Sequence, residues 1–243
     1  MTKKLFIHGG SSQISKYFLK NHVDEFSEFH IFCRDIVKTK SNLNINNYEN
    51  NGKKFFFYVN DLNDLSQTIV DINKLPNDLS GIFWVTGYMG DVNLEIRNYE
   101  KAKESLNVNF INAALSITLL LKKILLQRST FICVITSVAG LRGRSNRLYY
   151  SSAKGGLINF MSGLRQMYKN KIKIITIIPG YISTKGLSSK GFNLLVTSPE
   201  KTANIITECI RKNKPVVYIN FLWKYIMIII NLIPERIFKR FNF

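Results

Sequence analysis

Short apolar runs alternate along the chain with longer segments in which apolar residues recur at helical spacing. The runs predict seven strands, at residues 4–8, 29–33, 54–59, 81–86, 130–136, 172–177 and 215–218. Several are apolar throughout, as is typical of strands covered on both faces of a sheet. Helical periodicity falls at 13–21, 65–72, 95–126, 149–168 and 199–212. This alternation predicts an α/β fold, a single-domain, doubly wound parallel sheet flanked by helices.

Two segments depart from the alternation. Residues 38–53 are rich in asparagine and predict a solvated loop, whereas the chain after residue 215 is apolar and aromatic with a basic end. Lys224, Asn231 and Pro234 interrupt this apolar end, so it falls short of the roughly 20 apolar residues that span a bilayer. We therefore divide the chain into a domain at 1–219 and an apolar C-terminal helical tail at 220–243. A helix apolar nearly all round must be buried, so the tail is core, an oligomer contact or a membrane-surface helix.

Composition adds few constraints. The 243 residues, 46% of them hydrophobic, suffice for one large core. The net charge of +18 invites a nucleic-acid partner, but the lysines are scattered and no nucleic-acid-binding motif occurs, so we expect none. Cys33, Cys133 and Cys209 lie far apart without metal-ligand spacing, so we expect reduced thiols, no metal and a cytoplasmic protein. Too few apolar residues precede Gly9 for a signal peptide.

A glycine-containing turn, HGGSSQIS, follows the first predicted strand and precedes the first predicted helix. This order is typical of the phosphate-binding entrance of a dinucleotide fold. Such turns hold three spaced glycines, whereas here only the adjacent Gly9 and Gly10 occur. The turn by itself is therefore either a cofactor site or an ordinary loop.

The stretch YYSSAKGG carries the clearest chemistry. Tyr150 and Lys154 are four residues apart and share one face of a helix, and an ammonium beside a phenol lowers the pKa of the phenol. Ser137 follows a predicted strand, where ligands of such sheets gather. A hydroxyl there can hold a substrate carbonyl while Tyr150 delivers a proton.

In this order and spacing, the residues up to about 218 resemble those of the short-chain dehydrogenase/reductases. The resemblance implies a Rossmann-type fold and an NAD(P)-dependent oxidoreductase that acts on an alcohol or a carbonyl. It implies that Tyr150 protonates the carbonyl oxygen, Ser137 orients it, and Lys154 binds the nicotinamide ribose and tunes Tyr150. Asn109, in LNVNFINA, matches the fourth family residue, which would hold a water linked to Lys154. We expect the neighbouring Asn107 and Asn112 to be surface or helix-packing residues.

The same resemblance implies the cofactor contacts. Gly9 matches the first family glycine, while Gln13 and Ser15 stand in place of the second and third. Because backbone N–H groups still open a helix there, we interpret the stretch as a working cofactor turn. The expected contacts are Gly9, Ser11, Ser12, Gln13, Ile14, Arg34, Asp61, Leu62, Gly87, Tyr150, Lys154, Pro179, Gly180, Ile182 and Thr184.

Arg34 follows the second predicted strand, where a guanidinium suits the 2′-phosphate of NADP. NADPH/NADP is therefore the expected cofactor. If Asp35 instead holds the ribose, NAD(H) is the alternative.

The sequence also suggests a substrate class. Tyr-Met-Gly-Asp at 88–91 and the tail are similar to those of decaprenylphosphoryl 2-keto-ribose reductases and related envelope-glycan reductases, which implies polysaccharide biosynthesis and a carrier-linked keto-sugar. The alternatives are a 3-oxoacyl or generic ketone reductase, or a non-catalytic nucleotide-binding protein. The family implies homodimers or homotetramers. Lys224, Arg236, Lys239 and Arg240 of the tail would face anionic lipid at the inner face of the membrane.

Overall fold

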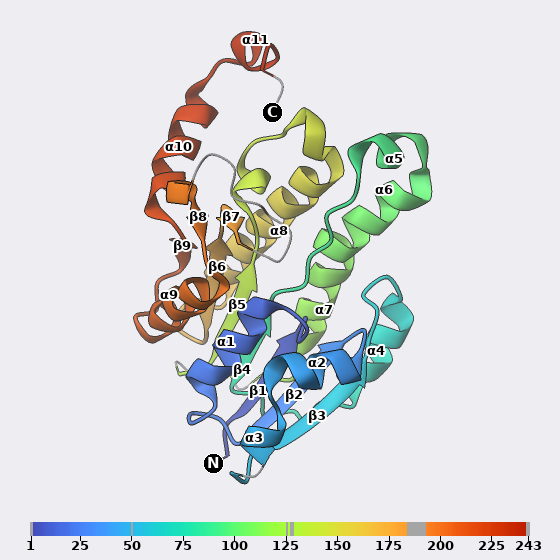
Figure 1. Cartoon of the computed structure of the whole chain (residues 1–243), viewed down its shortest axis with the longest axis vertical. Helices are drawn as coiled ribbons and strands as arrows, with labels where there is room; N and C mark the ends of the chain where they lie inside the picture. Colours follow the sequence, from blue (N-terminus) through green and yellow to red (C-terminus); the bar gives the residue numbers. More distant parts are fainter. Residues whose placement is uncertain (1, 50, 125, 127–128, 184–192, 242–243) are drawn as a thin grey trace.

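Seven parallel strands form one twisted sheet with the order β3-β2-β1-β4-β5-β6-β9 (Figure 1). The computed structural model describes residues 2–49, 51–124, 126, 129–183 and 193–241. The strands are β1 (Lys4–His8), β2 (Glu28–Cys33), β3 (Lys54–Val59), β4 (Gly81–Trp84), β5 (Phe131–Ile135), β6 (Lys173–Ile178) and β9 (Val216–Tyr218). The strand order reverses between β1 and β4, and ligands of such sheets bind beyond the carboxyl ends of the strands at this point. The predicted doubly wound α/β fold is confirmed.

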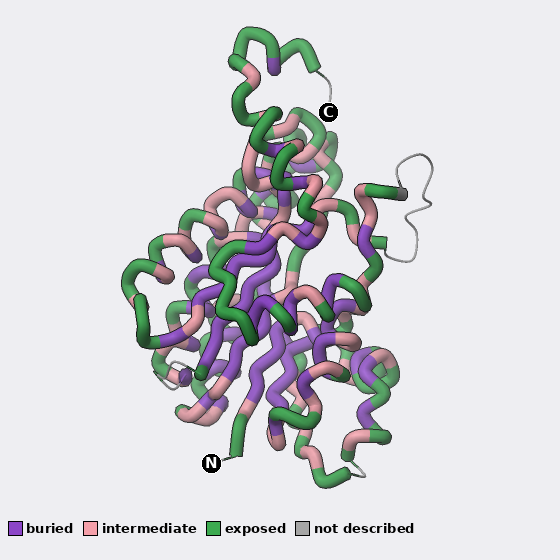
Figure 2. The backbone as a smooth tube through the Cα atoms, turned by 90° about the vertical axis from the view of Figure 1, so that its left-hand side faces the viewer, coloured by how far each residue is buried: buried purple, intermediate pink, exposed green. Residues whose placement is uncertain are grey.

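Helices cover both faces of the sheet. The longer ones are α1 (Gln13–His22), α4 (Leu65–Asn73), α6 (Tyr99–Leu106), α7 (Asn112–Leu120), α8 (Leu148–Met167) and α9 (Pro199–Arg211). One core joins α1 and α9 to one face through residues such as Phe18 and Ile206. The other joins α4, α7 and α8 to the opposite face through residues such as Ile117 and Leu157. The sheet therefore runs through the middle of the molecule as a buried layer (Figure 2).

Two sequence-based element assignments are wrong. The segment 95–126 is not one helix, because Asn98 ends α5 (Val92–Arg97) and its side chain accepts the amides of Glu100 and Lys101 at the start of α6. This helical path continues through a π-helical turn, η1 (Asn107–Ile111), and α7 ends at Leu120 rather than 126. Beyond α7, the Lys123 carbonyl accepts the Leu79 amide at 2.9 Å, and this contact directs the segment after α7 toward β5.

The segment 38–53 is not a plain loop. Asp35 caps α2 (Ile36–Leu43) by accepting the Lys38 amide at 2.9 Å, and the short α3 (Asn46–Glu49) follows. Leu43 and Ile45 are buried against the sheet. Two apolar residues within an asparagine-rich stretch are enough to fix it to the core.

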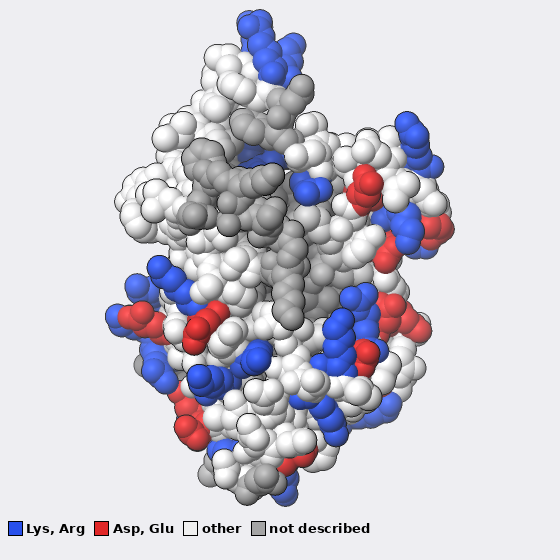
Figure 3. Space-filling model, in the orientation of Figure 1, with Lys and Arg blue, Asp and Glu red and all other residues white. Residues whose placement is uncertain are grey.

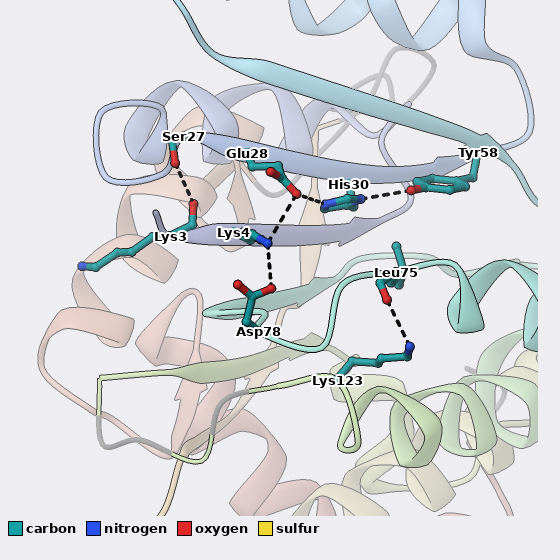
Figure 4. A network of polar contacts seen from close by, with 9 residues as sticks. All are labelled: Lys3, Lys4, Ser27, Glu28, His30, Tyr58, Leu75, Asp78 and Lys123. Atoms are coloured by element: carbon teal, nitrogen blue, oxygen red, sulfur yellow. Dashed lines mark hydrogen bonds and ion pairs between the residues drawn. The ribbon is translucent and has the colours of Figure 1, made fainter. Parts of the chain in front are cut away.

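A polar network closes the amino-terminal end of the sheet, away from the carboxyl ends of the strands (Figure 4). Lys4 lies 2.8 Å from Asp78 and 4.0 Å from Glu28, and Glu28 contacts His30 at 2.7 Å. These contacts tie β1, β2 and the turn before β4 together.

The chain after β9 forms α10 (Phe221–Leu232) and α11 (Glu235–Phe238) at the upper end of Figure 1. Trp223 and Met227 of α10 pack on Val138 and Ile178. The other side of α10 is open, with Ile229 65% and Leu232 75% exposed. Lys and Arg side chains gather over α11 (Figure 3). Among the described helices, none combines the length and apolar character needed to cross a membrane.

Candidate active site

Ser137, Tyr150 and Lys154 converge beyond the carboxyl end of β5. Ser137 follows β5 and begins η2 (Val138–Leu141), while the other two lie on consecutive turns of α8. The Ser137 hydroxyl hydrogen-bonds the Tyr150 phenol, and Lys154 Nζ lies 5.8 Å from the Tyr150 ring centroid. The sequence-predicted hydroxyl, phenol and amine are thus adjacent.

A close approach of two backbones makes this convergence possible. A Cβ on Gly140 would lie 2.6 Å from the Lys154 carbonyl carbon, and one on Gly155 would lie 2.9 Å from the Gly140 carbonyl oxygen. Side chains at either position would push the η2 segment away from α8. The two glycines therefore keep Ser137 within reach of Tyr150.

Burial decides the protonation of both titratable groups. It raises the pKa of Tyr150, although the Ser137 hydrogen bond and the charge of Arg147 oppose this. It lowers the pKa of Lys154 to about 8, because a charged amine is poorly solvated in the interior. The expectation that Lys154 lowers the pKa of Tyr150 is therefore wrong for the protein alone, and Tyr150 remains a protonated acid at neutral pH.

Asn109 lies inside the π-helical turn η1, and its side chain is fully engaged. Its Nδ2 donates to the Tyr88 carbonyl at 2.6 Å and the Ser105 carbonyl at 2.9 Å, and its Oδ1 accepts the Tyr88 amide at 3.0 Å. Asn109 thus fixes the segment after β4. A Cβ on Gly87 would lie 3.3 Å from Lys154 Nζ and 3.4 Å from Asn109 Oδ1, so these groups share one small space.

The surroundings of the two neighbouring asparagines fit the expected surface or helix-packing roles. Asn112 is buried and donates to the Leu62 carbonyl at 2.7 Å, as a helix-packing residue does. Asn107 is half-buried.

A cavity of about 420 Å³ opens in front of Ser137, Tyr150 and Lys154. Pro179, Gly180 and Ile182 line it, as does Trp223 from the tail. The Trp223 indole covers Gly180 so closely that a Cβ there would lie 1.9 Å from its Nε1. This Nε1 donates to the Leu195 carbonyl at 3.1 Å. The tail thus completes a cavity wall, and Thr184 lies outside the described residues.

A second cavity, of about 300 Å³, shares Val85, Gly87 and Tyr88 with the first. Of the expected cofactor contacts it is lined by Gly9, Ser11, Ser12, Arg34, Asp61, Leu62 and Gly87. Two other expected cofactor contacts, Gln13 and Ile14, line neither cavity. We call the first the substrate-side cavity and the second the turn-side cavity; they adjoin at Val85, Gly87 and Tyr88, and we refer to the two together as the cleft.

The glycine turn is built around its two glycines. Gly9 has a φ of +97°, and a Cβ on Gly10 would lie 2.4 Å from Ile31 Cγ2. Ser15, in place of the third family glycine, is buried and donates to the Gly9 carbonyl at 2.9 Å. Gln13 donates to Asn42 of α2 at 2.5 Å and does not line the turn-side cavity, whereas Gly9, Ser11 and Ser12 do. The turn is thus open although two family glycines are replaced.

Arg34 and Asp35 have different surroundings at the end of β2. Arg34 is exposed and lines the turn-side cavity, whereas the Asp35 carboxylate is occupied by the amide of Lys38 at the start of α2. Asp61 accepts the Asn63 amide at 3.0 Å and also borders the cavity.

A buried histidine that was not predicted from the sequence lines the turn-side cavity. His8 stacks on Trp84 with ring centroids 4.0 Å apart, and burial lowers its pKa to about 3. Its ring nitrogens contact Thr86 at 2.5 Å and Asn60 at 3.3 Å. Since neutral imidazole has one donor, and Asn60 Nδ2 already faces Thr68 and Asp71, the arrangement fits a proton on Nε2. The only signal in the sequence is the polar residue ending an apolar strand.

The described residues contain no cluster of three or more His, Cys, Asp or Glu side chains that could hold a metal ion. The three cysteines are buried and unpaired.

Known proteins resemble this chain in sequence over part or most of its length. The family model for short chain dehydrogenase matches residues 3–218. The 3-oxoacyl-[acyl-carrier-protein] reductase of Bos taurus is 30% identical over 122 residues, which cover 50% of this chain and 52% of that protein. The chain thus spans about half the length of the curated relatives it matches.

Solved structures share the fold at low sequence identity. A short-chain dehydrogenase/reductase from Serratia marcescens is 14% identical with a TM-score of 0.77, covering 90% of this chain and 97% of that one. ElxO with NADP bound is 21% identical with a TM-score of 0.73 and the same coverage. The family match over most of the chain shows that it belongs to the short-chain dehydrogenases.

Proposed function

We propose that this protein is an NADPH-dependent reductase that converts a carbonyl group into an alcohol. The observation that carries the proposal is the convergence of Ser137, Tyr150 and Lys154 in one cavity. That cavity shares Val85, Gly87 and Tyr88 with a second one, which lies at a glycine turn and a helix N-terminus. The 3-oxoacyl reductase and NADP-bound relatives support the same class of activity.

The turn-side cavity fits a dinucleotide phosphate. Gly9, Ser11 and Ser12 line it, and Ser11 and Ser12 lie at the start of α1, where backbone N–H groups can bind a phosphate. Arg34 offers a guanidinium to a 2′-phosphate, whereas the Asp35 carboxylate is already used by α2. This favours NADPH over NADH, which remains the alternative cofactor.

When bound, the reduced nicotinamide supplies the hydride for the carbonyl carbon. Tyr150 donates its phenolic proton to the carbonyl oxygen, and its burial keeps that proton in place near neutral pH. The Ser137 oxygen accepts the Ala139 amide at 3.1 Å, and its hydroxyl, which bonds the Tyr150 phenol in the protein alone, would turn to a bound carbonyl oxygen and orient it. Lys154 lies beside the phenol and close to Gly87, where it would hold the nicotinamide ribose and can resupply the proton. Asn109 fixes the backbone around Tyr88. We propose that it also holds a water next to Lys154.

The substrate that we propose is a keto-sugar on a lipid or nucleotide carrier in polysaccharide biosynthesis. A 3-oxoacyl substrate is the second candidate, which the named Bos taurus relative favours. Mass spectrometry of envelope glycans in a deletion strain separates them. An altered sugar supports the keto-sugar assignment, whereas unchanged glycans with altered acyl chains support the other.

Calorimetric titration with NADPH tests the catalytic proposal against a non-catalytic nucleotide-binding role. We expect saturable binding together with NADPH oxidation when a panel of ketones is added. Binding without turnover of any ketone would favour the non-catalytic alternative, and absence of binding would contradict both.

We further propose that the tail, 220–243, contacts an anionic membrane on the cytoplasmic side. The exposed apolar side of α10 includes Phe221, Tyr225, Ile229 and Leu232, and Arg236, Lys239 and Arg240 provide positive charge next to it. Because Trp223 and Met227 hold α10 on the domain, the test replaces exposed residues rather than removing the tail. The double variant Ile229→Ser, Leu232→Ser should no longer sediment with phosphatidylglycerol vesicles and should bind NADPH as the wild type does. If the wild-type protein does not sediment, the membrane contact is wrong.

A homodimer or homotetramer is the assembly that we propose. Ile111 and Leu115, on the η1–α7 path, and Leu148 of α8 are exposed apolar residues on helices that carry the site. Light scattering on the purified chain should give a mass of two or four protomers, and a monomer at micromolar concentration would contradict the proposal.

A further inference from the structure

Three arginines lie in the sequence LRGRSNR between Ser137 and Tyr150, and they have different surroundings. Arg142 is structural, because it pairs with Glu235 at 2.7 Å and lies 4.3 Å from the centroid of the Phe238 ring. It thereby joins this segment to α11. Arg144 and Arg147 instead line the substrate-side cavity.

The positive charge of that cavity has no carboxylate opposite it. Its described lining residues include Arg144, Arg147 and Lys154 but no aspartate or glutamate. All sixteen acidic residues of the chain lie in its described part, and none of the ion pairs found there uses Arg144 or Arg147. Arg144 and Arg147 are half-buried and have no carboxylate partner among the described residues, so both can pair with an anion that enters the cavity.

The contacts of the two guanidinium groups leave most of their donors available. Arg144 approaches the Met227 sulfur at 3.9 Å, and Arg147 donates to the neighbouring Asn146 carbonyl at 3.3 Å. Arg147 is also near enough to Tyr150 for its charge to act on the phenol. A group bound by these arginines would therefore belong to the molecule whose carbonyl Tyr150 protonates.

We infer that the substrate-side cavity takes a carbonyl compound that carries an oxyanion, held by Arg144 and Arg147 while its carbonyl faces Ser137 and Tyr150. The inference rests on the proposed reductase function and narrows its substrate class. A planar guanidinium presents two parallel N–H donors to a phosphate or a carboxylate, and both anions satisfy this chemistry. The cofactor phosphates do not need these arginines, because Arg34 and the glycine turn lie in the other cavity. A volume of about 420 Å³ is in the range of small-molecule sites.

The position of the segment supports this assignment. Arg144 and Arg147 lie between η2, which contacts α10, and α8, which contacts α5 and α6, and both line the substrate-side cavity. Positive charge at such a place also increases the rate at which an anion enters.

The test compares matched neutral and charged ketones with NADPH. Dihydroxyacetone is paired with dihydroxyacetone phosphate, and methyl acetoacetate is paired with acetoacetate. We expect the wild-type protein to prefer one charged compound by kcat/KM. Arg144→Gln and Arg147→Gln should each reduce that preference about 10-fold or more, since hydrogen bonds to charged groups contribute that much. Arg97→Gln, which removes an exposed guanidinium from α5, is the matched control and should leave the preference unchanged.

The two pairs distinguish the anions. A preference for the phosphorylated ketone assigns phosphate, and a preference for acetoacetate assigns carboxylate. Equal use of charged and neutral ketones, unaltered in the two variants, would overturn the inference while leaving the reductase function intact.

A binding measurement keeps the inference testable without turnover. Dihydroxyacetone phosphate and acetoacetate are titrated calorimetrically into Tyr150→Phe loaded with NADPH, with and without Arg144→Gln and Arg147→Gln. We expect binding that weakens in the arginine variants and falls as salt is raised. If no ketone is reduced but this binding is seen, the reductase proposal fails and the anion site stands. Binding that is absent, or equal in all variants, would contradict the anion site.

Discussion

Lys154 Nζ lies over the ring of Tyr150, 5.8 Å from its centroid, in a site where burial lowers the pKa of the amine to about 8. An exposed lysine keeps its proton to a pH above 10. The protein thus holds an amine that costs stability when charged and lies beside the phenol, to which it can return a proton. Stability and activity should therefore respond in opposite directions when Lys154 is replaced.

For Lys154→Met we expect loss of reductase activity together with higher stability at pH 7. Between about pH 8 and the unfolded value of 10.5, the unfolded chain binds this proton and the folded chain does not. The free energy of unfolding of the wild type therefore rises with pH across this window relative to the variant, by up to about 3 kcal/mol. Urea titrations from pH 7 to 10 measure this difference in unfolding free energy, and the exposed Lys169→Met is the control. A variant that is less stable than wild type at pH 7 would contradict the assignment.

Asn109→Leu should destabilise the fold and weaken substrate binding. It leaves the Tyr88 amide, the Tyr88 carbonyl and the Ser105 carbonyl without their present partner. Each unsatisfied buried group costs about 1–3 kcal/mol, so we expect a loss of several kcal/mol in urea denaturation and faster hydrogen exchange at the Tyr88 amide. The half-buried Asn107→Leu is the control. Equal effects of the two substitutions would show that Asn109 has no special positioning role.

Arg34→Asp should change cofactor preference from NADPH toward NADH. Loss of the guanidinium removes charge-assisted hydrogen bonds to a 2′-phosphate, so the KM for NADPH should rise about 10-fold or more. Asp35→Asn retains a capping oxygen for α2 and tests the alternative ribose contact. If NADH use is lost in Asp35→Asn and NADPH use is unchanged in Arg34→Asp, the assignment of the two residues is reversed.

His8 should make stability depend on acid. Its pKa is about 3 in the folded protein, so between pH 6.5 and 3 only the unfolded chain takes up this proton. The wild type should lose unfolding free energy as the pH falls through this window, by as much as about 1.4 kcal/mol per pH unit. Because His22 and His30 are also buried, the measured quantity is the difference between wild type and His8→Thr in denaturation curves from pH 4 to 8. Parallel curves would mean that His8 is not buried as a neutral ring.

The sequence was sufficient for the parts of the site that depend on local spacing. Tyr150 and Lys154 share a helix face, and Ser137 follows an apolar strand, so their types and places follow from the chain itself. The sheet was equally predictable, because its central strands are apolar on both faces.

Contacts between distant segments were not predictable. Trp223 was assigned to a tail, yet it covers Gly180 and lines the cavity. The pairing of Gly140 with Gly155, and the contacts of His8 with Asn60, depend on how separate elements pack. The upward shift of the Tyr150 pKa is caused by burial, which the spacing of residues along a helix does not reveal. Asn98 was missed as a helix boundary because a single capping residue interrupts an otherwise continuous helical pattern.

The central claim is that hydride reaches a carbonyl carbon while Tyr150 supplies the proton. The most direct measurement uses NADPH deuterated at C4 of the nicotinamide, on the transferred side, with a ketone that the wild type reduces. Mass spectrometry should find one deuterium at the carbinol carbon of the product. The Tyr150→Phe variant should bind NADPH as the wild type does and form product at least about 100-fold more slowly, the lower range for removal of a general acid. Product without deuterium, or formed at the wild-type rate by Tyr150→Phe, would contradict the mechanism.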